Sequence, residues 1–196
     1  MNTYLLKISA FLLSTLFLVA CSSTPTSLAL TPKLDGKVAT NDIQRPQSWL
    51  IKSKDLRTAR YLIAISSGDD VAELINESSS TRLAIEKTLQ NHWQKQGHQF
   101  TDNQDNSHQI EVQLVKLLAE VEQATLSHET EINAIIKIQL KTNLTTYSKT
   151  FRSHYERTSP FSAKVDSLGT QLNTQLSQLL EQIVEDEELN SKLLSL

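Results

Sequence analysis

The amino-acid sequence predicts an α+β fold in which an antiparallel sheet of about 4–5 strands carries two long amphipathic helices packed on one face. Two patterns support this prediction. Apolar residues recur at helical spacing in residues 81–96 and 163–184. They alternate with polar residues over much of 110–155, as in strands that bury one face. A sheet covered by both helices on its apolar face would bury all of these side chains.

The first strands are expected before the first helix. Residues 49–51 and 60–65 are short and rich in β-formers, so they predict two strands with a polar link between them. Asp55 and Arg57 lie in this link, and we expect their side chains to pair and fix the turn. Ser66–Asp70 then supplies turn residues. Its two carboxylates could also hold a hard cation, but their spacing differs from that of a calcium loop and favours a turn or helix cap.

The first helix is expected to begin at a cap on Ser80 or Thr81 and to run through Gln96. Gly97 is a typical C-terminal stop. The apolar residues at helical spacing are Leu83, Ile85, Leu89 and Trp93.

Three consecutive strands should follow as an antiparallel meander. Residues 110–121 alternate in part, and residues 132–140 alternate clearly. Asn143–Leu144 predicts a turn into the third strand, where the aromatic residues of one face are Tyr147, Phe151 and Tyr155. This stripe, with Trp49 and Trp93 elsewhere, could be core or a contact platform, and core is favoured. Lys137 and Lys141 are expected on the solvent face, where they could meet anionic lipid, glycan or protein.

A second long helix is expected from a cap at Ser162 over residues 163 to about 184. Its apolar stripe comprises Val165, Leu168, Leu172, Leu176, Leu179, Leu180 and Ile183. A short terminal helix over 187–194 is expected after the acidic run Glu185–Glu188. This run could attract a basic partner, although a solvated helix junction is favoured.

The N-terminus has the layout of a secretory signal. Lys7 precedes an uncharged 13-residue stretch, Ile8–Ala20, and polarity returns after Cys21, the one cysteine of the chain. Thirteen helical residues reach about 20 Å, which is less than the roughly 30 Å of a bilayer core. A cleaved signal is therefore favoured over a membrane-spanning helix.

The end of this stretch, Leu18-Val19-Ala20-Cys21, resembles the lipobox of bacterial lipoproteins. The resemblance implies that a signal peptidase recognises Leu18, Val19 and Ala20, and that Cys21 carries S-diacylglycerol and an N-acyl chain. It also implies that Ser22 permits sorting to the outer membrane, with the periplasmic face of the inner membrane as the alternative. An ordinary cleavable signal, or a buried cysteine, is the competing interpretation of Cys21.

This organisation predicts three segments: a signal peptide over 1–20, an acylated N-terminus and flexible tether over 21–48, and a single periplasmic domain over 49–196. The tether is inferred from Pro25, Pro32 and the many Ser and Thr residues, which show no regular period.

Residues 49–194 together with the lipobox resemble the YajG family of uncharacterised bacterial lipoproteins. The resemblance rests on the Asp-x-Arg turn at Asp55 and Arg57 and on three stretches: SSSTRLAIEKTLQNHWQKQGHQF, IEVQLVKLLAEVEQ and TFRSHYE. It implies a lipid-anchored α+β domain. It provides no catalytic residue and no cofactor.

The sequence shows little sign of chemistry. The formal net charge is −3, which argues against a nucleic-acid partner. The histidines, which lack metal-ligand spacing and are expected at the surface, are His92, His98, His108, His128 and His154. We find no nucleophile motif or phosphate loop, and we expect no cofactor and no metal.

The function that fits these observations best is a non-enzymatic, membrane-anchored domain that binds an envelope protein, glycan or lipid and supports envelope assembly or maintenance. The alternative is a carrier for a lipid or amphipathic small molecule held between helices and sheet. An enzyme acting on cell-wall material is disfavoured.

Overall fold

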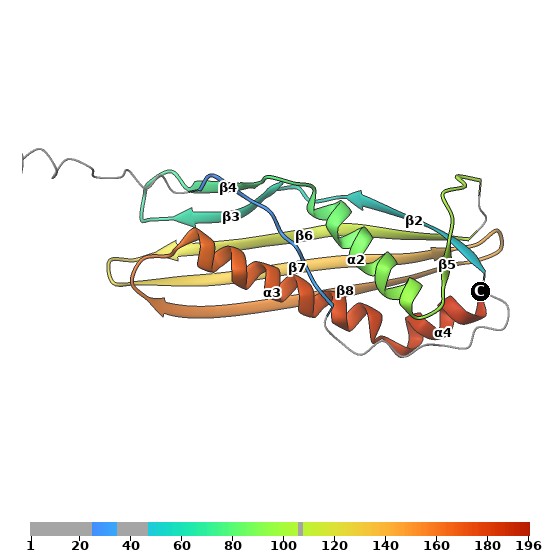
Figure 1. The fold of residues 1–196 in the computed structure, drawn as a ribbon. Coiled ribbons are helices and arrows are strands. Elements are labelled where there is room, and N and C mark those ends of the chain that lie inside the picture. The colour runs from blue at the N-terminus through green and yellow to red at the C-terminus, as the bar shows by residue number, and fades with distance from the viewer. Residues whose placement is uncertain (1–24, 35–46, 106–107) are drawn as a thin grey trace, which may run out of the picture.

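The computed structural model describes residues 25–34, 47–105 and 108–196. The described elements are β1 (Ser27–Leu28), β2 (Ser48–Asp55), β3 (Tyr61–Ser66), β4 (Glu73–Glu77), α2 (Thr81–Lys95), β5 (Gln99–Phe100), β6 (Gln109–Gln123), β7 (Ser127–Lys141), β8 (Thr146–Pro160), α3 (Val165–Val184) and α4 (Glu187–Ser195). The α+β class is confirmed, and Figure 1 shows the long helices crossing one face of a sheet of extended strands.

The predicted meander is present as β6, β7 and β8, each 15 residues long and antiparallel to the next. Apolar alternation in β6 and β7 favours this arrangement, and β8 adds the three aromatic residues of its inner face to the apolar side. In the middle of the sheet, Ile136 lies opposite both Leu114 and Phe151 on the buried face. The aromatic stripe of β8 faces the core, as expected, since Phe151 is buried and Tyr147 and Tyr155 pack against the core cluster.

The prediction of an antiparallel sheet is wrong for the first strands. Both β2 and β3 run parallel to β6 and lie along the same edge of it, one after the other. The link between them therefore shifts the chain sideways and does not reverse it. Parallel pairing needs a long crossover connection, and the chain through β4 and α2 supplies it. The sheet has eight strands among the described residues and is mixed.

A buried charge cluster lies at the break between β2 and β3. Arg57 donates from Nε to Asp55 Oδ1 at 3.0 Å and from Nη2 to Asp55 Oδ2 at 2.8 Å. Nη2 also lies 3.2 Å from Glu77 Oε2 at the end of β4. The Arg57 side chain is 1 % exposed. The expected Asp55–Arg57 pair is thus confirmed, and it ties the break to a neighbouring strand.

Helix α2 has the predicted limits. Ser80 Oγ accepts from Leu83 N at the cap, and Gly97 follows the helix with a φ of +103°. Ile85, Leu89 and Trp93 are buried, as the stripe predicted. Leu83 is 48 % exposed and does not join them, because the buried face follows the i, i+4 row from Ile85.

Helix α3 buries every residue of its predicted stripe against the sheet. It begins two residues later than expected, and its N-cap is Lys164, with no side-chain cap bond, and not Ser162. Asp186 caps α4 by accepting from Leu189 N at 2.8 Å. No helix among the described residues is long and apolar enough to cross a membrane.

Residues 25–34 fall in the segment expected to be a tether, yet they pack on the domain. β1 pairs with β4, and the chain then passes between α3 and α2 (Figure 1). Thr31 N donates to Asn173 Oδ1 at 2.9 Å, and Leu30 is buried in the core. The Leu28 side chain packs beside Gly169 of α3, at a distance that a Cβ there would meet in ordinary van der Waals contact. This stretch is therefore part of the folded unit.

We predict that Asp55→Asn lowers the free energy of unfolding by about 3 kcal/mol, because it leaves a buried guanidinium short of negative charge. Urea denaturation at pH 7 measures this. Asp69→Asn, in an exposed turn, is the matched control and should change stability by less than about 0.5 kcal/mol.

The loss should also depend on pH in a defined direction. Hydrogen bonds from Arg57 hold the pKa of Asp55 below its ordinary value of 3.8, despite partial desolvation. The contribution of Asp55 is therefore complete above about pH 4 and is lost as the pH falls through the folded-state pKa. The stability difference between wild type and Asp55→Asn should shrink below pH 4, and a constant difference would contradict this assignment.

Candidate functional site

The face of the sheet opposite the helices carries both polar and apolar side chains, and we call it the open face. No helix among the described residues packs on it. Along β7, the side chains on this face are Glu131, Asn133, Ile135, Lys137 and Gln139, each at least partly exposed. The strictly alternating burial of β7 shows that the two faces of the sheet are distinct.

Charge on the open face is divided along the strands. One half is mostly basic, with Lys52, Lys54, Lys137, Lys141 and Arg152 around a single acid, Glu111. The other half is acidic, with Glu120, Glu122, Glu129, Glu131 and Glu156. A hydrogen bond with Glu156 and repulsion from the neighbouring carboxylates raise the pKa of Glu129. Within each half, charged residues of one strand lie an even number of positions apart, so their side chains are on the same face of the sheet.

Glu111 organises the basic half. Its Oε2 lies 3.0 Å from Lys54 Nζ and 2.8 Å from Lys141 Nζ, and Gln113 Nε2 donates to its Oε1. Desolvation by itself would raise the pKa of Glu111, but these hydrogen bonds and charges lower it to about 2. Lys137 and Lys141 were expected on this face and are there.

A gap interrupts the sheet between the two halves. The β2–β6 ladder ends at Leu114 and the β3–β6 ladder begins at Ala119, so residues 115–118 have no strand partner on that edge in the described chain. Opposite the gap, the β6–β7 register shifts between Leu114 and Lys116, which marks a β-bulge. Alternation changes phase there, so Lys116 and Leu118 face the open side.

The gap contains a cavity of about 340 Å³ with largely apolar walls. We call this cavity the sheet gap. It is lined by Arg57, Thr58, Ala59, Val115, Lys116, Leu117, Leu118 and Ile135. Because Lys116 and Ile135 are opposite each other on the open face, the cavity opens away from the helices. The volume suits one large apolar side chain or a small ligand.

Arg57 gives the sheet gap a rigid wall. Its Nη2 and Nε are held by carboxylates, while Nη1 has no hydrogen-bond partner among the described residues. Buried guanidinium nitrogens usually have a hydrogen-bond partner, so Nη1 of Arg57 is an exception among the described residues. Two carboxylates neutralise the arginine, and the wall is therefore not a site for an anion.

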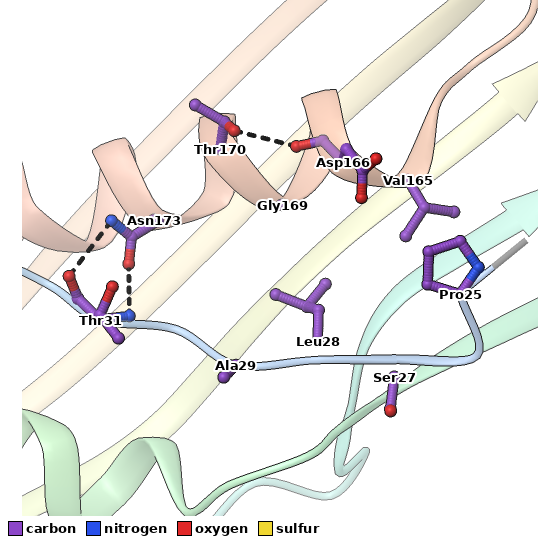
Figure 2. Close-up of a pocket in the computed structure, with 10 residues that line it drawn as sticks. All are labelled: Pro25, Ser27, Leu28, Ala29, Thr31, Val165, Asp166, Gly169, Thr170 and Asn173. Atoms are coloured by element: carbon purple, nitrogen blue, oxygen red, sulfur yellow. Dashed lines mark hydrogen bonds between the residues drawn. The ribbon is translucent and has the colours of Figure 1, made fainter.

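The face covered by helices has shallower openings. Figure 2 shows a groove of about 380 Å³ between residues 25–31 and the first turns of α3. Its hydrogen bonds are internal: Thr31 is bonded to Asn173, and Thr170 Oγ1 donates to Asp166 O at 2.9 Å. A second opening, about 240 Å³, is lined by Leu34 and His92. Neither brings together groups suited to acid–base chemistry.

The prediction that the histidines lie on the surface is wrong for three of them. His92, His98 and His128 are buried: His92 lies on the inner side of α2, His128 on the inner side of β7, and His98 in the connection between α2 and β5. Desolvation lowers the pKa of His92 and of His98. His108 packs edge-on against Trp49 with ring centroids 5.4 Å apart, and His154 is exposed. Within the described ranges, no three His, Cys, Asp or Glu residues form a metal-binding group.

The other sequence candidates have structural roles. Ser66–Asp70 contains a turn in which Asp70 N donates to Ser67 O at 3.1 Å. In the acidic run, Asp186 and Glu188 each lie 2.8 Å from Lys149 Nζ, which joins α4 to β8. Trp49 and Trp93 are both buried and offer no contact platform.

The predicted lipobox lies outside the described residues. Leu18, Val19, Ala20, Cys21 and Ser22 therefore keep the roles expected from the sequence, without a structural test.

Sequence reasoning missed the sheet gap. The signal was present, because apolar residues occupy positions 110, 112 and 114 and then 117, 119 and 121. A change of phase by one residue within a strand predicts a bulge. The gap itself also needs β2 and β3 on the same edge of β6, and no local pattern specifies that.

One solved structure supports the fold. A crystal structure of a DUF330 protein from Xanthomonas campestris matches with a TM-score of 0.54 at 10% identity, covering 81% of this chain and 92% of that one. A second crystal structure, of an uncharacterized protein, matches with a TM-score of 0.49 at 12% identity, covering 82% and 97%. No curated protein matches the chain.

One protein-family model matches nearly all of the described domain. A family described as uncharacterized lipoprotein, Lipoprotein_16, matches residues 32–194. The match includes both long helices, the meander and the two strands that flank the sheet gap. The chain therefore belongs to this family of uncharacterized, YajG-type lipoproteins.

Proposed function

We propose that this protein is a non-enzymatic lipoprotein of the outer membrane, anchored through acylated Cys21, whose periplasmic domain binds another envelope protein through its open face. The observation that carries the proposal is the sheet gap, a largely apolar cavity in the middle of a charged, uncovered sheet. Such a cavity fits an apolar side chain projecting from a partner.

The surroundings of the sheet gap favour a protein partner of a particular kind. Lysines and Arg152 dominate the half of the open face on one side of the gap, and glutamates dominate the half on the other side. A partner with an apolar side chain between an acidic and a basic segment would match this surface in one orientation. Electrostatic complementarity of this kind sets orientation and association rate more than affinity.

The packing of the interior favours a protein that binds a partner at its surface over a protein that carries a lipid inside. A carrier would need a cavity between the helices and the sheet. The side chains that meet there, including Leu172, Leu176 and Ile136, have no exposed area and belong to one continuous core. The sheet gap opens on the other side of the sheet.

We predict that Ile135→Glu abolishes partner binding, because it places a charge at the mouth of an apolar cavity. A photo-crosslinking residue at Thr58 would report binding in intact cells, and the adduct with the partner should fall at least fivefold. Leu144→Glu makes a similar change at an exposed turn residue and should leave the adduct unchanged. An undiminished adduct in folded Ile135→Glu would contradict a role for the sheet gap.

The anchor has its own test. Cys21→Ala should abolish incorporation of labelled palmitate and leave the precursor uncleaved, because the diacylglyceryl cysteine is the modified group. Gel mobility and mass spectrometry measure both effects. Continued acyl labelling of the Cys21→Ala protein would disprove attachment at this residue.

The assignment to the outer membrane depends on Ser22. Ser22→Asp should move the protein from outer-membrane to inner-membrane fractions in a sucrose gradient, whereas Ser23→Asp should move it less. If wild type already fractionates with the inner membrane, the outer-membrane assignment is wrong and acylation is unaffected.

A further inference from the structure

Three connections meet at one end of the sheet, which we call the turn end: residues 67–72, 124–126 and 161–164 (Figure 1). They are together because β3 ends beside the end of β6, and β8 ends beside the start of β7. The opposite end of the meander carries the β7–β8 turn.

Three large apolar side chains are exposed at the turn end, and one of them is Val71, which is 98 % exposed in the β3–β4 connection. Leu126 is 77 % exposed and Phe161 is 75 % exposed. They are held side by side, since Phe161 N donates to Leu126 O at 2.8 Å and His128 Nδ1 lies 2.9 Å from Phe161 O. Phe161 has a φ of 65°, in the left-handed region that bulky residues rarely occupy. A strained, exposed aromatic residue indicates a contact that the isolated domain lacks.

The packed N-terminal segment fixes where the anchor reaches the domain. β1 runs parallel to β4 and away from the turn end, so the chain before it leads back toward that end. By strand register, Pro25 lies about level with Glu120. Pro25 and Val165, at the start of α3, line the same groove (Figure 2). From this level to the tip of the turn end is about five residues, or about 16 Å.

Cys21 is too close in the chain to let the domain stand away from a bilayer. Three residues separate it from Pro25, and the four residue-to-residue steps can span at most about 14 Å. This reach is no longer than the distance by which the turn end extends past Pro25. An acylated Cys21 in the membrane therefore brings the turn end to the membrane surface.

We propose that Leu126 and Phe161 insert into the interfacial region of the same bilayer that holds the acyl chains of Cys21. This contact rests on the lipid attachment proposed above. It gives the protein a second membrane contact and a fixed orientation, with the strands rising from the membrane and the open face accessible from the side. The partner site and the membrane site are then different surfaces of one rigid domain.

The charge around the turn end specifies the lipid. Asp69, Asp70, Glu122 and Glu129 flank the projecting residues, and Lys164 is the nearest cation in the sequence after Phe161. An acidic end is repelled by anionic headgroups and tolerated by zwitterionic ones. The surface that fits is therefore a zwitterionic phospholipid bilayer.

The test uses the complete acylated protein in vesicles of phosphatidylethanolamine and phosphatidylcholine. Acylation consumes the one native thiol, so Leu126→Cys introduces a unique site for an environment-sensitive NBD label. Leu144→Cys is the matched control, because Leu144 is 94 % exposed in the β7–β8 turn at the other end. The label at 126 should shift to the blue and be quenched by membrane-embedded nitroxide lipid at least threefold more than the label at 144.

The outcomes separate the two proposals. Mass spectrometry and vesicle flotation of the same sample show whether Cys21 is acylated and holds the protein on the vesicles. Absence of acylation and of flotation would overturn both the lipid attachment and the membrane contact of the turn end. Flotation with equal quenching at 126 and 144 overturns the membrane contact alone. Quenching at 126 that falls as anionic phosphatidylglycerol is added supports the zwitterionic assignment, and an increase contradicts it. A blue shift seen in native envelopes and absent from protein-free vesicles would assign the turn end to a protein partner and overturn the proposal.

Discussion

The ion pair between Asp55 and Arg57, extended to Glu77, is the interaction on which the arrangement of the sheet depends. It holds the chain at the point where β2 leaves the edge of β6 and before β3 returns to it. This sidestep of the chain leaves four residues of β6 unpaired, and the sheet gap is the space that results. A local charge pair thus produces the most distinctive surface feature of the domain.

The second constraint is the N-terminal segment, which passes between the two long helices. Its buried Leu30 and its hydrogen bonds to α3 make it a part of the domain, so three residues lie between Cys21, the proposed site of lipid attachment, and the described domain. A long tether would let the domain sample many orientations. Under the proposed attachment at Cys21, a short connection would couple the orientation of the domain to the membrane surface and hold the proposed partner site on the open face in a fixed direction.

The two faces of the sheet differ in their surroundings and in the side chains that they carry. The helix-covered face supplies stability through one continuous apolar core. The open face carries the segregated charges and the apolar cavity. Family membership assigns no activity to either face, because the family is described as uncharacterized. The resemblance in fold to a DUF330 protein concerns the architecture alone.

The sequence by itself determined the features that depend on local pattern. Helix α2 with its Ser80 cap and Gly97 stop, the buried stripe of α3, the alternating strand β7 and the Asp55–Arg57 pair all follow from spacing and short-range chemistry. Only the tertiary structure decided that β2 and β3 are parallel to β6, that residues 25–34 belong to the domain and that His92 is buried. These outcomes depend on which distant segments meet. A strand has the same alternation whether its neighbour is parallel or antiparallel, and burial is a property of the surroundings that a residue acquires on folding.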